Sequence, residues 1–244
     1  INKSIRIVSM IIYIYGEDTF RSRNYLKQQV ERFKKERDPQ NLNVVFLDGQ
    51  KTESSRIWNE ITAMPFLAEK RMIIVQNVLT SKDQEVLESL VEGIKDKKVP
   101  EKNIIIFYQN EPVGKSKIVL ELQKILAKEK WAMQFENLVG FKLSAWIKEE
   151  VARRAPQRGP VGGGAINSAA IAYLAQNAGQ DTWYADSLID QLVAYAEGKE
   201  ISLADVQLFL EEKVDDSMFN MVDAIVIGNR KLAFKLIEEQ RRLG

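Results

Sequence analysis

The chain has 244 residues, with 35 lysines and arginines against 34 aspartates and glutamates, and a formal net charge of +1. This balance gives no overall positive field, so any contact with DNA must be local or supplied by partners. The sequence has no cysteine, which excludes disulfides and thiolate chemistry, and no histidine, which removes the commonest general base and metal ligand. The apolar run Ile5 to Tyr15 is too short to cross a bilayer, and we expect no membrane contact. Met10 within this run is a possible native start.

The first part of the chain alternates short apolar runs with longer amphipathic segments. Continuous apolar runs of this length are typical of strands that are covered on both faces. The five predicted strands are Ile11–Tyr15, Asn43–Leu47, Met72–Val78, Ile104–Tyr108 and Trp131–Phe135. Segments with apolar residues at helical spacing separate them, for example Leu87, Leu90, Val91 and Ile94. Alternation of this kind predicts an α/β domain with a parallel sheet and helices on both of its faces, which we assign to residues 1–143.

After Leu143 the pattern becomes helical, and no convincing strand follows. We expect Ser144 to cap a helix over Ala145–Arg154, and a glycine-rich loop from Ala155 to Ala165 to follow it. Further helices are predicted at Ser168–Ala178, Thr182–Glu197, Ser202–Glu212, Ser217–Ile227 and Arg230–Leu243. The sequence therefore predicts an all-α domain over residues 144–213 and the first helices of another over 214–244.

Two glycine motifs invite a nucleotide-binding interpretation. Gly114-Lys115-Ser116 matches the end of a phosphate-binding loop, but the glycine required five positions earlier is Gln109, and Glu111 and Pro112 lie between them. The turn after the first strand, Gly16 to Phe20, is short and acidic and has no lysine, so Asp18 or Thr19 is better interpreted as a helix cap. We expect no cofactor, no metal and no catalytic set; an ATPase that uses Gly114-Lys115-Ser116 remains the alternative.

The connection from Met64 to Arg71 carries the strongest candidate site. Pro65 disfavours helical geometry at Met64, so the preceding helix from Ser54 should end there. Phe66 and Leu67 follow at once on a tight corner. One interpretation is that they plug the end of the local core, since most large apolar residues are buried. The other is that they face solvent and enter a pocket on a partner protein, where a few anchors carry most of the binding energy.

Several segments in order along the chain resemble the delta subunit of the bacterial DNA polymerase III clamp loader. The opening strand and turn, Ile11 to Phe20, resemble an AAA+-like, RecA-like domain without its P-loop, and Ala63-Met64-Pro65-Phe66-Leu67-Ala68 resembles the family's clamp-binding element. Trp146-Ile147, the segment from Gly179 to Val206, and the two segments Met218–Ile225 and Gly228–Ala233 are similar to its lid and collar. The loop Gly159–Gly164 is longer than in the family, and the family's collar extends beyond Gly244, so the resemblance implies a truncated chain.

The resemblance also implies a function. The chain would be a cytoplasmic, accessory subunit of the DNA-directed DNA polymerase holoenzyme, a nucleotidyltransferase, with no catalysis of its own. It would bind and open the sliding clamp (the beta subunit) through Met64, Pro65, Phe66 and Leu67. Its other partners would be clamp-loader subunits of the gamma/tau and delta-prime types, contacted through lid and collar, and it would meet DNA only within the assembled loader. A nucleic-acid-binding helical module over Leu143–Gly244 is a weaker alternative, because the chain is nearly neutral.

Overall fold

The computed structural model describes residues 10–154, 165–211 and 221–243. The chain divides into two compact units, Ile1–Asn137 and Leu138–Gly244. The first unit is an α/β domain and the second is helical, which confirms the predicted fold class. The finer division at residues 143 and 213 stays a prediction, and residue 143 lies within the first helix of the second unit.

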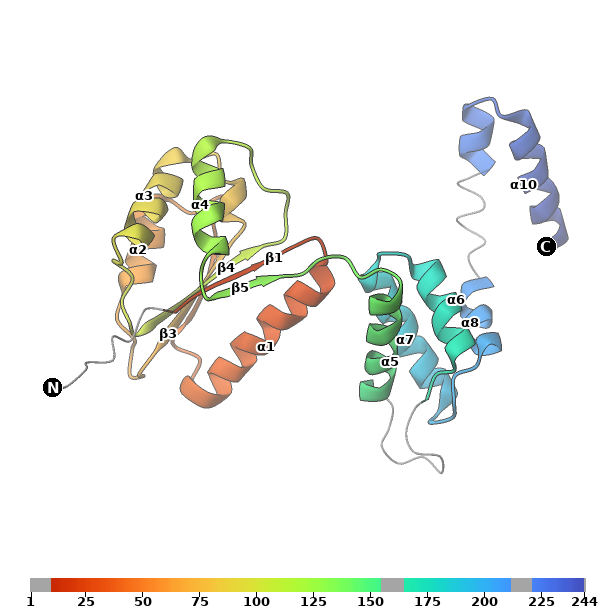
Figure 1. The fold of residues 1–244 in the computed structure, drawn as a ribbon, viewed down its shortest axis with the longest axis horizontal. Helices are drawn as coiled ribbons and strands as arrows, with labels where there is room; N and C mark the ends of the chain where they lie inside the picture. The colour runs from red at the N-terminus through yellow and green to blue at the C-terminus, as the bar shows by residue number, and fades with distance from the viewer. Residues whose placement is uncertain (1–9, 155–164, 212–220, 244) are drawn as a thin grey trace. The chain divides into compact units, whose positions relative to one another are not determined.

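The first unit is built on a five-stranded parallel sheet with strand order β2-β3-β4-β1-β5 (Figure 1). All five predicted strands are present, and each of their ends lies within two residues of the prediction. The strands are β1 (Met10–Tyr15), β2 (Val44–Asp48), β3 (Arg71–Gln76), β4 (Asn103–Gln109) and β5 (Trp131–Gln134). The central strands are buried on both faces, which is why they appear in the sequence as unbroken apolar runs.

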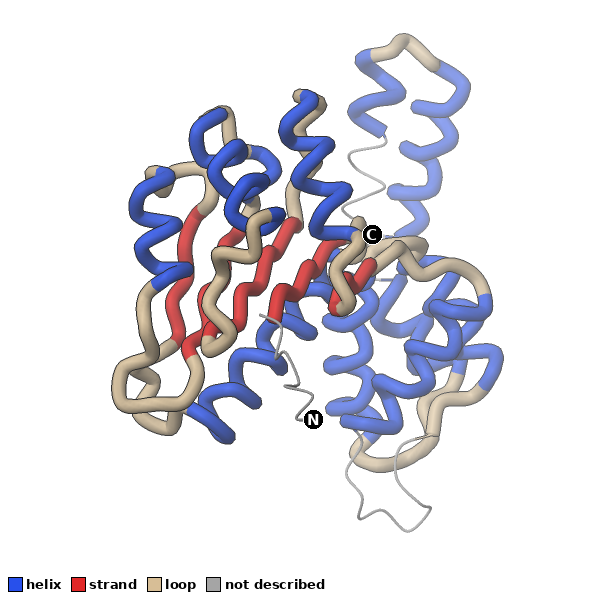
Figure 2. Tube along the Cα trace, turned by 60° about the vertical axis from the view of Figure 1, so that its left-hand side comes forward, coloured by secondary structure: helices blue, strands red, loops and turns tan. Residues whose placement is uncertain are grey.

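Helices cover the two faces of this sheet unequally. One face packs against α1 (Thr19–Arg37), and the other against α2 (Ser54–Thr62), α3 (Gln84–Lys95) and α4 (Lys117–Ala127), as Figures 1 and 2 show. A short 3₁₀ helix, η1 (Val78–Thr80), follows β3. Because side chains alternate along a strand, Met72 and Ile74 belong to the core beneath α1, whereas Ile73 and Val75 belong to the larger core on the other face.

The register of the sheet determines what surrounds the start of β3. Arg71 of β3 pairs with Asn103 of β4, and Met72 pairs with Val44 of β2. Asn43, directly before β2, and Asn103 therefore flank the residues through which the chain enters β3. In a parallel sheet the amino ends of all strands meet at one edge, so the connection from α2 to β3 lies at this edge together with both asparagines.

The second unit contains α5 (Phe141–Arg154), α6 (Ser168–Ala178), α7 (Thr182–Ala196) and α8 (Leu203–Glu211), packed around a core of aliphatic side chains. An isolated parallel bridge joins Ile166 to Ile201. The prediction that Ser144 caps the first helix is wrong: α5 begins at Phe141, and the Ser144 amide already donates to the Gly140 carbonyl at 3.1 Å. Gly140, with φ of 55°, provides the turn that starts the helix earlier. Residues 155–164 of the predicted loop Ala155–Ala165 lie outside the described residues.

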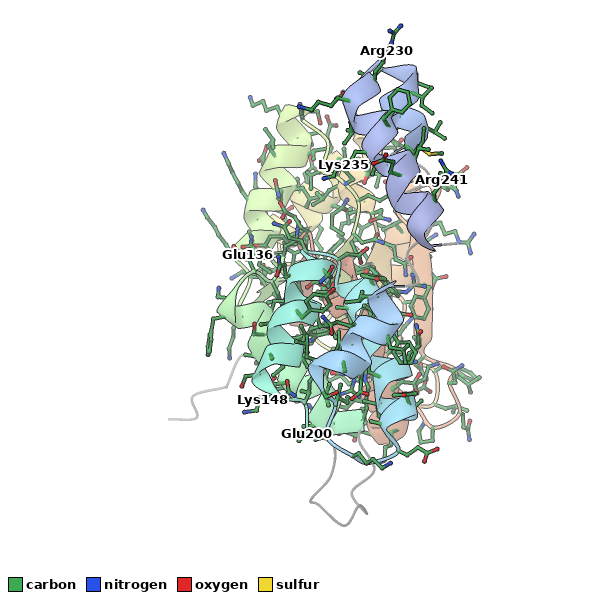
Figure 3. All side chains as sticks on the ribbon, turned by 90° about the vertical axis from the view of Figure 1, so that its right-hand side faces the viewer. Glu136, Lys148, Glu200, Arg230, Lys235 and Arg241 are labelled. Carbon is green, nitrogen blue, oxygen red and sulfur yellow. The ribbon has the colours of Figure 1, made fainter. Side chains whose placement is uncertain are left out.

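The last described segment holds a helix over residues 221–226 and α10 (Arg230–Leu243). Gly228, with φ of 76°, turns the chain between them, and the Asn229 amide donates to the Ala224 carbonyl at 2.9 Å. Figure 3 shows Arg230 and Arg241 toward opposite ends of α10. Both helices were predicted, although residues 217–220 at the start of the first lie outside the described residues. Among the helices of the described ranges, none combines the length and the apolar character required to cross a bilayer.

Candidate protein-binding site

The corner between α2 and β3 begins where the helix ends at Thr62. Ala63 has extended backbone angles, and its amide closes the helix by donating to the Asn59 carbonyl at 2.9 Å. Pro65 keeps the helix from continuing through Met64, because helical geometry is disfavoured for the residue before a proline. The helix thus ends two residues earlier than the Met64 predicted from the sequence. We define the corner as residues 63–70, between α2 and β3.

The apolar side chains of the corner face solvent. The exposed fractions of Met64, Phe66 and Leu67 are 63%, 59% and 84%, and Pro65 is partly exposed. The interpretation in which Phe66 and Leu67 plug the core is therefore wrong. Three large apolar side chains are thus exposed within four residues, and clustered exposed apolar residues of this kind mark interaction sites. Their role in binding a partner stays a prediction.

Asn43 holds the backbone of Phe66 from both sides of the residue. The Phe66 amide donates to Asn43 Oδ1 at 2.6 Å, and Asn43 Nδ2 donates to the Phe66 carbonyl at 2.8 Å. The buried Asn43 side chain thus does for Phe66 what a neighbouring strand would do, satisfying both backbone groups at once. The Asn43 carbonyl also accepts from the Met72 amide at 2.8 Å, which joins the two strands just beyond the corner.

Behind Asn43 lies the buried carboxylate of Asp38, the residue that ends α1. It accepts hydrogen bonds from the Asn43 amide at 2.8 Å, from Asn43 Nδ2 at 3.1 Å and from the Leu42 amide at 3.1 Å. Burial disfavours the charged form, but these donors outweigh that cost, so the pKa of Asp38 lies below its ordinary value. Asp38 therefore fixes the orientation of the Asn43 side chain.

Asn103 restrains the other end of the corner. Its buried Nδ2 donates to the carbonyls of Ile61 and Ala63 at 2.7 and 2.9 Å, satisfying acceptors that the end of α2 leaves open. Sequence reasoning missed Asp38, Asn43 and Asn103. The available signal was the position of each asparagine at the start of an apolar strand, where a polar side chain interrupts the expected pattern.

Leu67 has a left-handed backbone conformation, with φ of 51°. This region is unfavourable for a side chain of its size and persists where the surrounding structure imposes it. Leu67 directly follows Phe66, whose backbone is hydrogen-bonded to Asn43, and the exposed fraction of the Leu67 side chain is 84%. A residue under backbone strain with a fully presented apolar side chain is typical of a binding element rather than of a plain connection.

Charged residues border the apolar part of the corner. Glu69 pairs with Arg37 at 3.2 Å, Lys70 Nζ donates to the Glu101 carbonyl at 2.7 Å, and Arg71 pairs with Glu60. The first two lie on the surface and contribute little to stability. Their arrangement, an apolar centre with a polar border, is that of protein interfaces.

The Gly114-Lys115-Ser116 motif lies at the N-terminus of α4. Ser116 caps α4 by accepting from the Val119 amide at 3.4 Å, and the Gly114 amide donates to the Leu79 carbonyl at 3.0 Å. Gln109, where a phosphate loop has glycine, is buried and donates to the Glu111 carbonyl at 2.8 Å. Glu111 lies between Gln109 and Gly114, and its carboxylate accepts from Gln50 Nε2 at 2.6 Å. Amides engaged in this way, beside a carboxylate, do not form a phosphate cradle.

The turn after β1 is closed by the backbone of residue 135. A Cβ on Gly16, whose φ is 130°, would lie 2.1 Å from the Phe135 carbonyl oxygen, which itself accepts from the Asp18 amide at 3.0 Å. The buried Asp18 carboxylate caps α1 by accepting from the Arg21 amide at 2.9 Å. A carboxylate thus occupies the helix terminus that would receive a phosphate. Within the described ranges, acidic side chains form no group of three or more that could hold a metal ion.

A family model described as DNA polymerase III, delta subunit, matches residues 13–135, half of the chain. The chain belongs to this family. The matched residues include the whole corner, and the predicted clamp-loader delta family is confirmed. The family places the chain among the proteins of DNA replication. A comparison with curated protein sequences gives no match.

Solved structures share the fold across both units. The DNA clamp loader delta protein of Bacillus subtilis aligns with a TM-score of 0.58 and 17% identity, over 97% of this chain and 68% of that one. Two single-residue variants of RuvB from Thermotoga maritima align with TM-scores of 0.56 and 0.55, at 13% and 12% identity, each over 94% of this chain and 74% of that one. The predicted AAA+-like architecture is thereby confirmed.

Proposed function

We propose that this delta-family chain binds a sliding clamp by inserting Phe66 and Leu67 into an apolar pocket on the ring, with Met64 and Pro65 supporting them. Bound there, the chain holds one interface of the ring open so that DNA can enter. The observation that carries this proposal is the solvent exposure of Phe66 and Leu67 on a corner whose backbone is hydrogen-bonded to the buried Asn43. The family match covers this corner.

The energetics support insertion of the pair. Complete burial of the two side chains contributes about 3–6 kcal/mol, at about 1.5–3 kcal/mol for each large apolar side chain. Association also requires ordering of the contact residues, and a flexible loop would lose much of this gain. The hydrogen bonds from Asn43 and Asn103 order the corner before the partner arrives. Most of the burial energy then remains available for binding.

The proposal includes a division of work in the loader. ATP binding and hydrolysis belong to neighbouring subunits of the gamma/tau type, and the chain joins them and a delta-prime type subunit through its helical unit. The turn at Gly16 and the loop at Gly114 support this division, because their amides are engaged and carboxylates lie beside them. DNA contact occurs only in the assembled loader, consistent with the net charge of +1.

The direct test is the double variant Phe66→Ala with Leu67→Ala, measured for binding to the cognate clamp by surface plasmon resonance or calorimetry. We expect an affinity loss of at least about 100-fold, since about 1.4 kcal/mol corresponds to a factor of ten. The melting temperature should hardly change because both side chains are already exposed. Leu120→Ala, an exposed leucine on α4, is the matched control and should bind as wild type. Wild-type affinity of the double variant would refute the proposal.

A further inference from the structure

Leu42 is an exposed apolar residue that directly precedes Asn43. It precedes β2 and has an exposed fraction of 47%. Its amide donates to Asp38 Oδ1 at 3.1 Å, and the next residue, Asn43, is bonded to both backbone groups of Phe66. The Cα atom of Leu42 is thus one peptide unit, about 3.8 Å, from that of Asn43, the residue that is hydrogen-bonded to the corner. Although 24 positions separate Leu42 from Phe66 in the sequence, one hydrogen-bonded network fixes both backbones.

Interface size gives an independent reason to look beyond the corner. Specific protein interfaces bury about 800 Å² on each partner and involve roughly 20–30 residues a side. The four residues Met64 to Leu67 can supply only the centre of such a contact. The partner must therefore also touch surfaces that adjoin the corner. On the side of β2, the nearest large exposed apolar side chain in the chain order is Leu42.

We infer that Leu42 is a third anchor for the same protein partner, the sliding clamp, which would present an apolar groove that continues past the pocket for Phe66 and Leu67. This inference rests on the proposed function, because it takes the corner as the centre of the interface. Leu42, Phe66 and Leu67 form its apolar part, and the pair Glu69–Arg37 lies at its polar border. Asp38 holds the backbone of Leu42, Asn43 holds that of Phe66, and Leu67 follows Phe66 directly, so a rigid groove on the clamp can receive the three side chains together.

Phe46 limits how far this surface extends. It is exposed and lies four residues beyond Leu42, a displacement of about 13 Å along the strand at 3.3 Å per residue. Its position along β2 is therefore well removed from the corner. Leu42 therefore belongs to the proposed interface and Phe46 does not. Phe46, an exposed apolar residue of the strand that follows Leu42, serves as the internal comparison in the experiment.

The test measures the affinity of the full chain for the cognate clamp with Leu42→Ala, Phe46→Ala and Leu120→Ala. We expect Leu42→Ala to weaken binding about 3- to 10-fold, mainly through faster dissociation. Phe46→Ala and Leu120→Ala should bind as wild type. The melting temperature of Leu42→Ala should stay close to that of wild type because the side chain is half exposed. A second variant, Leu42→Asp, should weaken binding further, since it would bury a charge in an apolar groove.

The outcomes separate this inference from the proposed function. If Phe66→Ala with Leu67→Ala abolishes binding while Leu42→Ala and Leu42→Asp bind as wild type, only the assignment of Leu42 is overturned. If the double variant binds normally, the clamp-binding function fails and the inference with it. The alternative occupant of this surface is a second copy of the chain, which light scattering tests by measuring self-association. If Leu42→Ala changes the self-association of the chain, Leu42 contacts a second copy, and the assignment to the clamp is overturned.

Discussion

The side chain of Asn43 is paired with the backbone of Phe66, 23 positions further along the chain, through hydrogen bonds of 2.6 and 2.8 Å. This relationship links the exposed corner to the buried edge of the sheet. It explains how a connection that is neither helix nor strand can hold an apolar side chain in water in a defined position. A flexible loop with the same sequence would collapse onto the nearest apolar surface.

Asn43→Ala should weaken clamp binding about tenfold and destabilise the fold by about 1–3 kcal/mol, because it removes hydrogen-bond partners from the Phe66 backbone and from the buried Asp38 carboxylate. Hydrogen exchange separates the two effects: the Phe66 amide should lose protection under conditions in which the central strands keep theirs. Asn177→Ala is the matched control, since Asn177 also donates to a backbone carbonyl, that of Tyr173, in the other unit. Unchanged protection at Phe66 would contradict the positioning role of Asn43.

Asp38 should make part of the stability pH-dependent. Its pKa is lower in the folded state than in the unfolded chain, so its stabilising contribution is fully present above the unfolded value of about 4 and is lost as the pH falls through the folded value. We expect wild type to be more stable than Asp38→Asn at pH 7, and the difference in free energy of unfolding to shrink below about pH 4. Urea titrations of both proteins from neutral to acidic pH measure this. A difference that grows on acidification would show that the sign is wrong.

Leu67→Asn should affect stability and binding in opposite directions. Asparagine tolerates a positive φ better than leucine does, so relief of backbone strain should raise the free energy of unfolding by about 0.5–1 kcal/mol. The same change removes the most exposed apolar side chain of the corner and should reduce clamp affinity at least about tenfold. Thermal unfolding and a binding titration on one preparation provide both readouts. If the variant loses stability and keeps its affinity, the strain at Leu67 does not serve binding.

Magnesium ATP should leave the melting temperature of the isolated chain unchanged. A nucleotide at a hundred times its dissociation constant would add about 2.7 kcal/mol to the stability of the folded state. We expect no shift, because the amides after β1 and β4 are occupied by the Phe135 carbonyl, by the Asp18 carboxylate and by the Leu79 carbonyl. Lys115→Ala tests the alternative directly. A thermal shift with ATP that disappears in this variant would establish Gly114-Lys115-Ser116 as a nucleotide site.

The sequence by itself was sufficient for much of the first unit. Apolar runs marked the strands, helical spacing marked the segments that cover them, and Pro65 marked the end of α2 to within two residues. These signals are local, because each depends on periodicity or on the backbone of a single residue. The start of α5 was misjudged for the same reason. Ser144 is a good cap by type, but a turn at Gly140 had already begun the helix at Phe141.

The tertiary structure alone decided whether Phe66 and Leu67 are buried or exposed. Residue type favoured burial, whereas the tight corner and its resemblance to a clamp-binding element favoured exposure, so the sequence left both interpretations open. The outcome depends on Asn43 and Asn103, which lie before β2 and at the start of β4 and become neighbours of the corner only when the sheet forms. Their side chains form hydrogen bonds with backbone groups of Phe66 and Ala63, so the corner is held in place by its backbone while the side chains of Phe66 and Leu67 remain exposed. Contacts between residues far apart in the chain are set by strand order and register, which local sequence patterns do not encode.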